Sequence, residues 1–325
     1  MRYNKGQDSE QPTLPRKMVR ALIVFAALVT AASIAGCRDS VPSQGEVDKT
    51  WGRLGLEDGK FQKPRAGCID AEGRLYVVDM TARIQVFDEE GNFIRAWSSP
   101  DHATGRPSGL SIDRRGRLLV SDTHYFQVLI YSPEGVLLEK LGGTMGEGPG
   151  EFGLVTDAAE DSQGNLYVAE YGEYDRIQKF SPERKFLLQW GGHGEELGQF
   201  VRPQKMWIDA QDRIWVTDAC NHRIQVFDTE GKLLLHWGTP GSGPGELSYP
   251  YDISMDADGN LLVTEWGNHR IQKFTQDGKS LACFGKYGRK EPGEFFHPWG
   301  SMVDRQGRIN VIDSQNHRIQ RVLME

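Results

Sequence analysis

The chain has 325 residues, of which 38% are hydrophobic, and it carries a formal net charge of −7 at pH 7. This length allows one large domain or two ordinary domains with a packed core. The acidic balance argues against nucleic acid as a partner, because binding to phosphate needs clustered basic residues. Thirty-eight glycines, with eight tryptophans, ten tyrosines and fourteen phenylalanines, suit many short strands and tight turns better than a helical bundle.

The N-terminal region contains one apolar run, residues 21–35, preceded by several basic residues. Fifteen residues are fewer than the roughly 20 that span a bilayer, and a short run of this kind is typical of a secretory signal. Its end, Ile34-Ala35-Gly36-Cys37, resembles the lipobox of bacterial lipoproteins, whose cysteine becomes a lipidated N-terminus. The resemblance implies an exported chain of the cell envelope, anchored through Cys37 to a membrane, the outer one if the host is Gram-negative.

We therefore expect three parts: a signal peptide at 1–36, a lipidated cysteine with a short tether at 37–48, and a repeat domain at 49–325. Translation could start at Met1 or at Met18. Loss of the signal leaves 33 basic and 43 acidic residues, a net charge of −10. Three cysteines remain when Cys37 is set aside, namely Cys68, Cys220 and Cys283. This odd number at irregular spacing predicts small buried residues rather than a disulfide framework.

The rest of the chain repeats one unit six times. The five letters NHRIQ begin at Asn221, Asn268 and Asn316, and degenerate copies precede them. The residues at the arginine position lie 44 to 49 residues apart and are Arg83, Gln127, Arg176, Arg223, Arg270 and Arg318. Each unit contains the turn residues expected between four strands. A small four-stranded sheet buries both faces only by stacking on a neighbour. The sequence therefore predicts an all-β, six-bladed propeller of four-stranded antiparallel blades.

These units resemble NHL repeats, which are named for an Asn-His-Leu stretch that reads Asn-His-Arg at residues 221–223. The resemblance covers residues 49–325 and implies a fold rather than an activity, because propellers of this type include lyases, lactone hydrolases, RNA binders and scaffolds. Residues 51–64 match the link between two later blades, so we expect a strand near the N-terminus to complete the last blade.

Each motif arginine follows an acidic residue at the end of the preceding strand, as Arg223 follows Asp218. A hairpin over five residues can bring the two side chains together. The pattern predicts an ion pair inside each blade rather than a ligand site, because function rarely needs the same charge in every repeat.

Departures from the repeat are the candidates for function. One position of the repeat lies two residues after the proline position at the start of each innermost strand. It holds Gly109 in the second blade and Gly300 in the sixth, but the three central blades have Asp157, Lys205 and Asp252 there. Propeller symmetry should gather these charges around the axis. We expect them to form a polar, acidic ligand pocket at the channel mouth, beside blades two to five, with Asp122, His124, Tyr125, Glu173 and Tyr174. The alternative is that they are solvated charges of drifted repeats.

Two classes of function remain open. The first is a monomeric propeller that binds a peptide, glycan or protein of the cell envelope, without catalysis, metal or other cofactor. The alternative is a metal-dependent enzyme resembling peptidyl-α-hydroxyglycine α-amidating lyase, which holds zinc through histidines, or gluconolactonase, which holds calcium through carboxylates. The residues directly after the proline position include no histidine; they are Arg65, Ser108, Thr156, Gln204, Tyr251 and Trp299.

Overall fold

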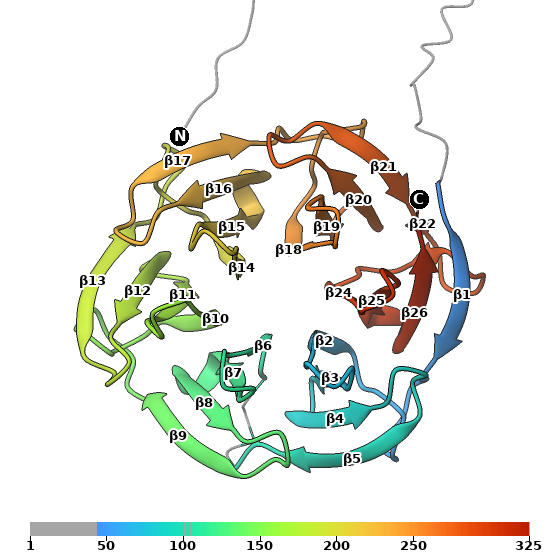
Figure 1. Cartoon of the computed structure of the whole chain (residues 1–325), viewed down its shortest axis with the longest axis horizontal. Coiled ribbons are helices and arrows are strands. Elements are labelled where there is room, and N and C mark those ends of the chain that lie inside the picture. The colour runs from blue at the N-terminus through green and yellow to red at the C-terminus, as the bar shows by residue number, and fades with distance from the viewer. Residues whose placement is uncertain (1–43, 101, 104–105, 325) are drawn as a thin grey trace, which may run out of the picture. The chain divides into compact units, whose positions relative to one another are not determined.

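The computed structural model describes residues 44–100, 102–103 and 106–324, and Cys37 lies outside these ranges. Six four-stranded antiparallel sheets are arranged in a ring (Figure 1), as the repeat predicts. The innermost strand of each blade lines the axis, and the fourth strand lies on the outside. The helices in the described part are three-residue turns, none long enough to cross a membrane.

The blades follow the chain in order. Blade 1 contains β2 Pro64–Ile69, β3 Leu75–Asp79, β4 Arg83–Phe87 and β5 Phe93–Ser98, and blade 2 contains β6 Gly109–Ile112, β7 Leu118–Asp122, η1 Thr123–Tyr125, β8 Gln127–Tyr131 and β9 Leu137–Gly142. Blade 3 contains β10 Leu154–Glu160, β11 Leu166–Tyr171, β12 Arg176–Phe180 and β13 Phe186–Gly191, and blade 4 contains β14 Pro203–Ile208, β15 Ile214–Asp218, η2 Ala219–Asn221, β16 Arg223–Phe227 and β17 Leu233–Trp237. Blade 5 contains β18 Pro250–Met255, β19 Leu261–Glu265, β20 Arg270–Phe274 and β21 Ser280–Phe284, and a short parallel pair follows, β22 Lys286–Tyr287 with β23 Glu294–Phe295. Blade 6 contains β24 Gly300–Val303, β25 Ile309–Asp313, η3 Ser314–Asn316, β26 Arg318–Leu323 and β1 Glu46–Trp51.

The ring is closed by strand β1, which pairs antiparallel with β26 and so confirms the expected closure. The strand begins at Glu46, three residues before the boundary expected at 49. Arg321 of β26 donates to Asp48 at 2.5 Å and contacts Glu90 of blade 1 at 3.2 Å. Two segments distant in sequence are thereby held together by both backbone and side-chain bonds.

The core lies between neighbouring blades rather than inside any one of them. Val78 and Ile84 of blade 1, for example, pack with Leu118 and Leu129 of blade 2. Tryptophans near the ends of outer strands pack on the turn glycine of the next blade. A Cβ added to any of these glycines would lie within 3 Å of the tryptophan ring. The pairs are Trp97 with Gly135, Trp190 with Gly231, Trp237 with Gly278, and Trp51 with Gly91. The last pair joins blade 6 to blade 1, so the closing contact is the same as the others.

The repeated motif clamps each blade to the glycine-rich link that enters it. Arg223 Nε donates to Asp218 at 2.7 Å, and its other nitrogens donate to three carbonyls of the link at residues 195–199. Asn221 and Gln225 donate to the same carboxylate and to the same link. The predicted ion pair is confirmed in five blades, with closest distances of 2.5 to 3.6 Å.

The motif histidines connect each blade to the next. His222 Nδ1 accepts the backbone N–H of Tyr249, His269 that of His297, and His317 that of Lys63. Each of the three donors directly precedes the proline at the start of a blade and has a φ near +49°. Burial lowers the pKa of all three histidines, that of His269 to about 4 with a further contribution from His297, so they remain neutral acceptors at pH 7.

We predict that Gly91→Ala destabilises the closed ring more than Gly116→Ala does. The two glycines have φ values of +74° and +75°, but a Cβ on Gly91 would lie 2.8 Å from Trp51, whereas nothing lies within 4 Å at Gly116. Left-handed backbone costs an alanine about 1–2 kcal/mol, and overpacking adds about 1–3 kcal/mol. Urea unfolding of both variants measures the difference, and equal losses would show that the Trp51 contact does not hold the ring.

Candidate functional site

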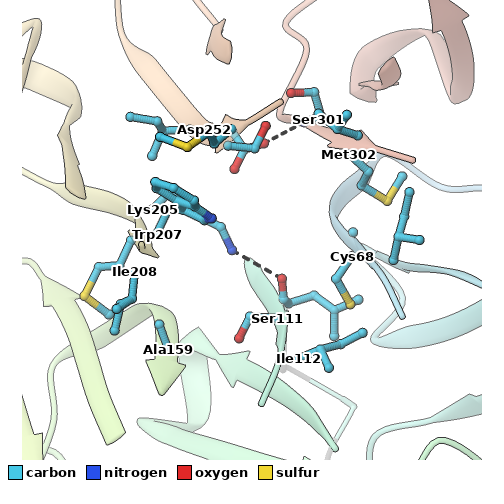
Figure 2. Close-up of a pocket in the computed structure, with 18 of the residues that line it drawn as sticks. Cys68, Ser111, Ile112, Ala159, Lys205, Trp207, Ile208, Asp252, Ser301 and Met302 are labelled. Atoms are coloured by element: carbon cyan, nitrogen blue, oxygen red, sulfur yellow. Dashed lines mark hydrogen bonds between the residues drawn. The ribbon is translucent and has the colours of Figure 1, made fainter. Parts of the chain in front are cut away.

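The channel has two ends of different character. We call the end that carries the links into the innermost strands the link face, and the opposite end the turn face. A cavity of about 340 Å³ opens along the channel towards the turn face (Figure 2). Its walls combine polar and apolar groups and come from all six innermost strands, with Ile112, Trp207, Ile208 and Met302 among the lining residues. Lys205 and Asp252 form its inner end.

The central charges predicted from the repeat do gather around the axis. Lys205 Nζ lies 3.1 Å from Asp157 Oδ1. It also donates to the carbonyl of Leu110 at 3.3 Å, the bond drawn from Lys205 in Figure 2. Asp157 is fully buried, and its second oxygen accepts the backbone N–H of Met206 at 3.0 Å. Burial opposes the charge of Lys205, but Asp157 and Asp252 outweigh it and raise its pKa. The ammonium and the Asp157 carboxylate therefore satisfy each other and join blades 2, 3 and 4.

Asp252 has a different role in the same layer. Its Oδ2 accepts the backbone N–H of Ser301 in blade 6 at 2.6 Å (Figure 2). Burial raises the pKa of this carboxyl to about 6, against the effect of Lys205 and the Ser301 bond. Glycine at 300 leaves space for this carboxylate, since a Cβ there would lie 3.1 Å from Asp252 Oδ2. The glycines of the repeat and the charges that replace them thus fit together across blade boundaries.

The charged layer nearly closes the channel. Between the turn-face cavity and the link face, the space beside Lys205 and Asp252 holds only about 10 Å³. Asp157, Lys205 and Asp252 therefore lie at a constriction in the middle of the channel, and not at its mouth as we expected.

The other predicted site residues do not join them. Asp122 is fully buried inside blade 2 and accepts a hydrogen bond from Gln127 at 3.2 Å. Glu173 and Tyr174 line a separate groove on the link face. His124 lines a pocket at the channel mouth, whereas Tyr125, in the same turn, is absent from its lining.

The pocket at the channel mouth, which we call the mouth pocket, is basic where we expected acidic residues. It measures about 240 Å³ and is lined by Arg65, Arg106, Ser108, Thr123, His124, Tyr171, Arg202 and Trp299. Sequence reasoning missed the three arginines. The available signal was their position, because each directly precedes or follows the proline of an innermost strand.

A row of aromatic rings continues from the mouth pocket over blades 4 to 6. Trp299 contacts Tyr251, Tyr251 stacks on Trp266, and Trp266 stacks on His297 with ring centroids 3.7 Å apart. We call this row the aromatic strip; it consists of His222, Tyr249, Tyr251, Trp266, His269, Tyr287, Phe296, His297 and Trp299. Two of its members, Tyr249 and Tyr287, are 37% and 58% exposed. The strip gives the link face a surface on which a flat ligand group can stack.

The residues of the channel do not fit a metal centre. In the part of the chain that the structure describes, no group of three or more His, Cys, Asp or Glu side chains is placed to hold an ion. Calcium would need carboxylate oxygens that converge on one point, but Asp157 is paired with Lys205 and Asp252 is turned to Ser301. Among the described residues, the channel therefore shows no cluster of the kind expected above for a zinc or calcium enzyme.

We predict that Lys205→Met costs about 3–5 kcal/mol of unfolding free energy, because it leaves the buried Asp157 carboxylate without its cation. The double variant with Asp157→Asn should recover most of the loss, since the amide oxygen can still accept from Met206. Urea unfolding of the two variants provides the measurement. A Lys205→Met variant as stable as the parent would mean that the pair does not hold the channel together.

Comparisons with known proteins agree with this architecture. Residues 206–263 match a family model described as a 6-bladed beta-propeller. The chain is 28% identical over 169 residues to NHL repeat-containing protein 3 of Mus musculus, covering 46% of this chain and 47% of that protein. It is 39% identical over 128 residues to peptidylglycine alpha-amidating monooxygenase of Rattus norvegicus, covering 36% of this chain and only 13% of the relative. The chain thus spans less than half the length of these relatives.

Solved structures share the fold at low sequence identity. A streptogramin B lyase superposes with a TM-score of 0.63 at 13% identity, covering 85% of this chain and 97% of the lyase. An auxiliary nutrient binding protein from Bacteroides ovatus superposes with a TM-score of 0.66 at 14% identity, covering 87% and 78%. The repeats, the closed ring and these matches together identify the described part of the chain as an NHL-type six-bladed β-propeller.

Proposed function

We propose that this chain is an exported, lipid-anchored binding module whose link face takes up a peptide, glycan or protein of the cell envelope. The observation that carries the proposal is the aromatic strip, which runs without interruption from the mouth pocket to the exposed ring of Tyr287. Aromatic rings are enriched at recognition surfaces, because they combine a large apolar area with few rotatable bonds. Rows of rings held in place by each other need little further ordering when a ligand stacks on them.

The chemistry of the channel supports binding over metal-assisted catalysis. Its central carboxylates are already used to join blades, and its central cation is paired with one of them. The similarity to an amidating enzyme covers only 36% of this chain. A ring of fixed blades whose aromatic strip is available for stacking is better suited to bind a ligand than to catalyse its reaction.

The ligand experiment compares binding to the purified chain with binding to two strip variants, across soluble peptides and glycans of bacterial envelopes. Trp266→Ala and Tyr287→Ala should each weaken a bound ligand about 10-fold or more, as expected for stacking residues at a recognition surface. Leu187→Ala is the matched control, because it removes an apolar side chain that is 48% exposed on the outer strand β13. Binding that is unchanged in both strip variants would place the site elsewhere.

The alternative function is tested by the metal content of the purified chain. One equivalent of zinc or calcium retained after dialysis would favour the metal-dependent lyase or hydrolase instead.

The anchor is tested at Cys37. Cells fed with labelled palmitate should label the parent chain and not Cys37→Ser, and the variant should move from the membrane fraction to the soluble extracytoplasmic fraction. Labelling that persists in Cys37→Ser, or a parent chain without label, would contradict the lipid anchor while leaving the ligand experiment untouched.

A further inference from the structure

The mouth pocket concentrates positive charge in an acidic protein. Arg65, Arg106 and Arg202 line it together with His124, and none of its lining residues is acidic. Nor does any salt bridge reach the three arginines within the described residues. The motif arginines are the opposite case, because Arg223 and its equivalents each face a buried carboxylate. The mouth arginines therefore lack the counter-charge that the motif arginines have.

Aromatic rings fix two of these guanidinium groups. The guanidinium of Arg65 lies 4.9 Å from the ring centre of Trp299, and that of Arg202 lies 4.7 Å from Tyr171 and 5.2 Å from Tyr251. Stacking on a ring occupies the face of a guanidinium and leaves its N–H edges for other acceptors. Arg202 uses Nε for Gln204 at 2.9 Å, and Arg65 uses Nη1 for the carbonyl of Arg106 at 3.2 Å.

Two donors among the residues that line the pocket have no acceptor in the described chain. Arg65 Nε and Trp299 Nε1 are both buried and have no hydrogen-bond partner in the described chain. Leaving a buried donor unpaired costs free energy. Burial, followed by the charges of Arg106 and Arg202, lowers the pKa of Arg65 to about 10. The pKa of His124 is lowered by burial and then by Arg65 and Arg106. An oxyanion in the pocket would relieve the crowding of these cations.

We propose that the mouth pocket binds the carboxylate of an acidic sugar, with Arg65 and Arg202 as the main contacts and Arg106 as a further cation. This proposal rests on the function proposed above and specifies its ligand. Guanidinium edges match the two coplanar oxygens of a carboxylate. The pocket volume of about 240 Å³ is below the roughly 300–1,000 Å³ of sites for drug-sized ligands, so the pocket suits a single small group. The rest of a glycan chain would continue onto the aromatic strip, which begins at Trp299.

The experiment is calorimetric titration of the purified chain with glucuronate, with glucose as the neutral match, and with inorganic phosphate as the non-sugar oxyanion. Glucuronate should bind at least 10-fold more tightly than glucose and more tightly than phosphate. Arg65→Gln and Arg202→Gln should each weaken glucuronate about 10-fold or more, through loss of a charge-assisted hydrogen bond. Arg202→Lys, which keeps the charge but not the planar fork, should bind with intermediate affinity. Arg115→Gln, an exposed arginine in the turn after β6 on the opposite face, should bind as the parent does.

Several outcomes would overturn the proposal. They are equal binding of glucose and glucuronate, tighter binding of phosphate than of glucuronate, and a loss in Arg115→Gln as large as that in Arg65→Gln. Urea unfolding of the arginine variants shows whether a loss reflects the pocket or the fold. A neutral ligand that is lost in Tyr287→Ala but kept in Arg65→Gln would leave the binding function standing and remove the carboxylate assignment. If glucuronate binds through the arginines but no envelope ligand binds the chain, the carboxylate assignment would stand and the proposed envelope-binding function would fall.

Discussion

The buried ion pair at the start of the third strand is the interaction on which the rest of this propeller depends. Asp218 is fully buried, and burial raises its pKa even though Arg223, Asn221 and a backbone N–H all bond to it. Such a pair adds little net stability, because desolvation offsets the attraction. What it provides is geometry: the arginine that satisfies the carboxylate also holds three carbonyls of the preceding link. In the five blades that carry the arginine, the path of the link across the face is therefore fixed from within the blade.

The link, once fixed, determines how the next blade is placed. Its last residue before the proline is held by a motif side chain of the preceding blade, through His222 for Tyr249, for example, or Asp175 for Arg202. These pre-proline residues adopt positive φ, a conformation that costs a non-glycine residue free energy and persists only where neighbours impose it. This conformation places the side chain of Arg202 at the channel mouth. The same bonds that order the ring thus decide which residues can meet a ligand, and Arg202 is one of them.

The sequence was sufficient for the fold because each blade repeats the same bonds. The spacing of the arginines, the acid before each of them and the aspartate-to-glycine turns all report local structure that recurs, and closure by the N-terminal strand followed from the match of residues 51–64 to a later link. The site was harder, because the repeat indicates which residues approach the axis but not at what depth. Asp157, Lys205 and Asp252 were correctly placed on the axis, yet they lie at mid-channel, where each carboxylate turns to the adjacent blade. Depth depends on side-chain direction and on neighbours that no single repeat contains.

The division of charge along the channel follows from the same constraint. At mid-channel the space between blades is small, so a charge persists only if a neighbouring blade supplies its partner, as Lys205 does for Asp157. At the mouth the links diverge, and a guanidinium can be partly buried against an aromatic face without an acid beside it, as Arg65 is against Trp299. Burial without an acidic partner is tolerated there because these arginines line a pocket that solvent or a ligand can fill. A propeller can therefore hold the charges at its axis by bonds between blades for stability and leave its mouth charged for recognition, since the two levels are built from different positions of one repeat.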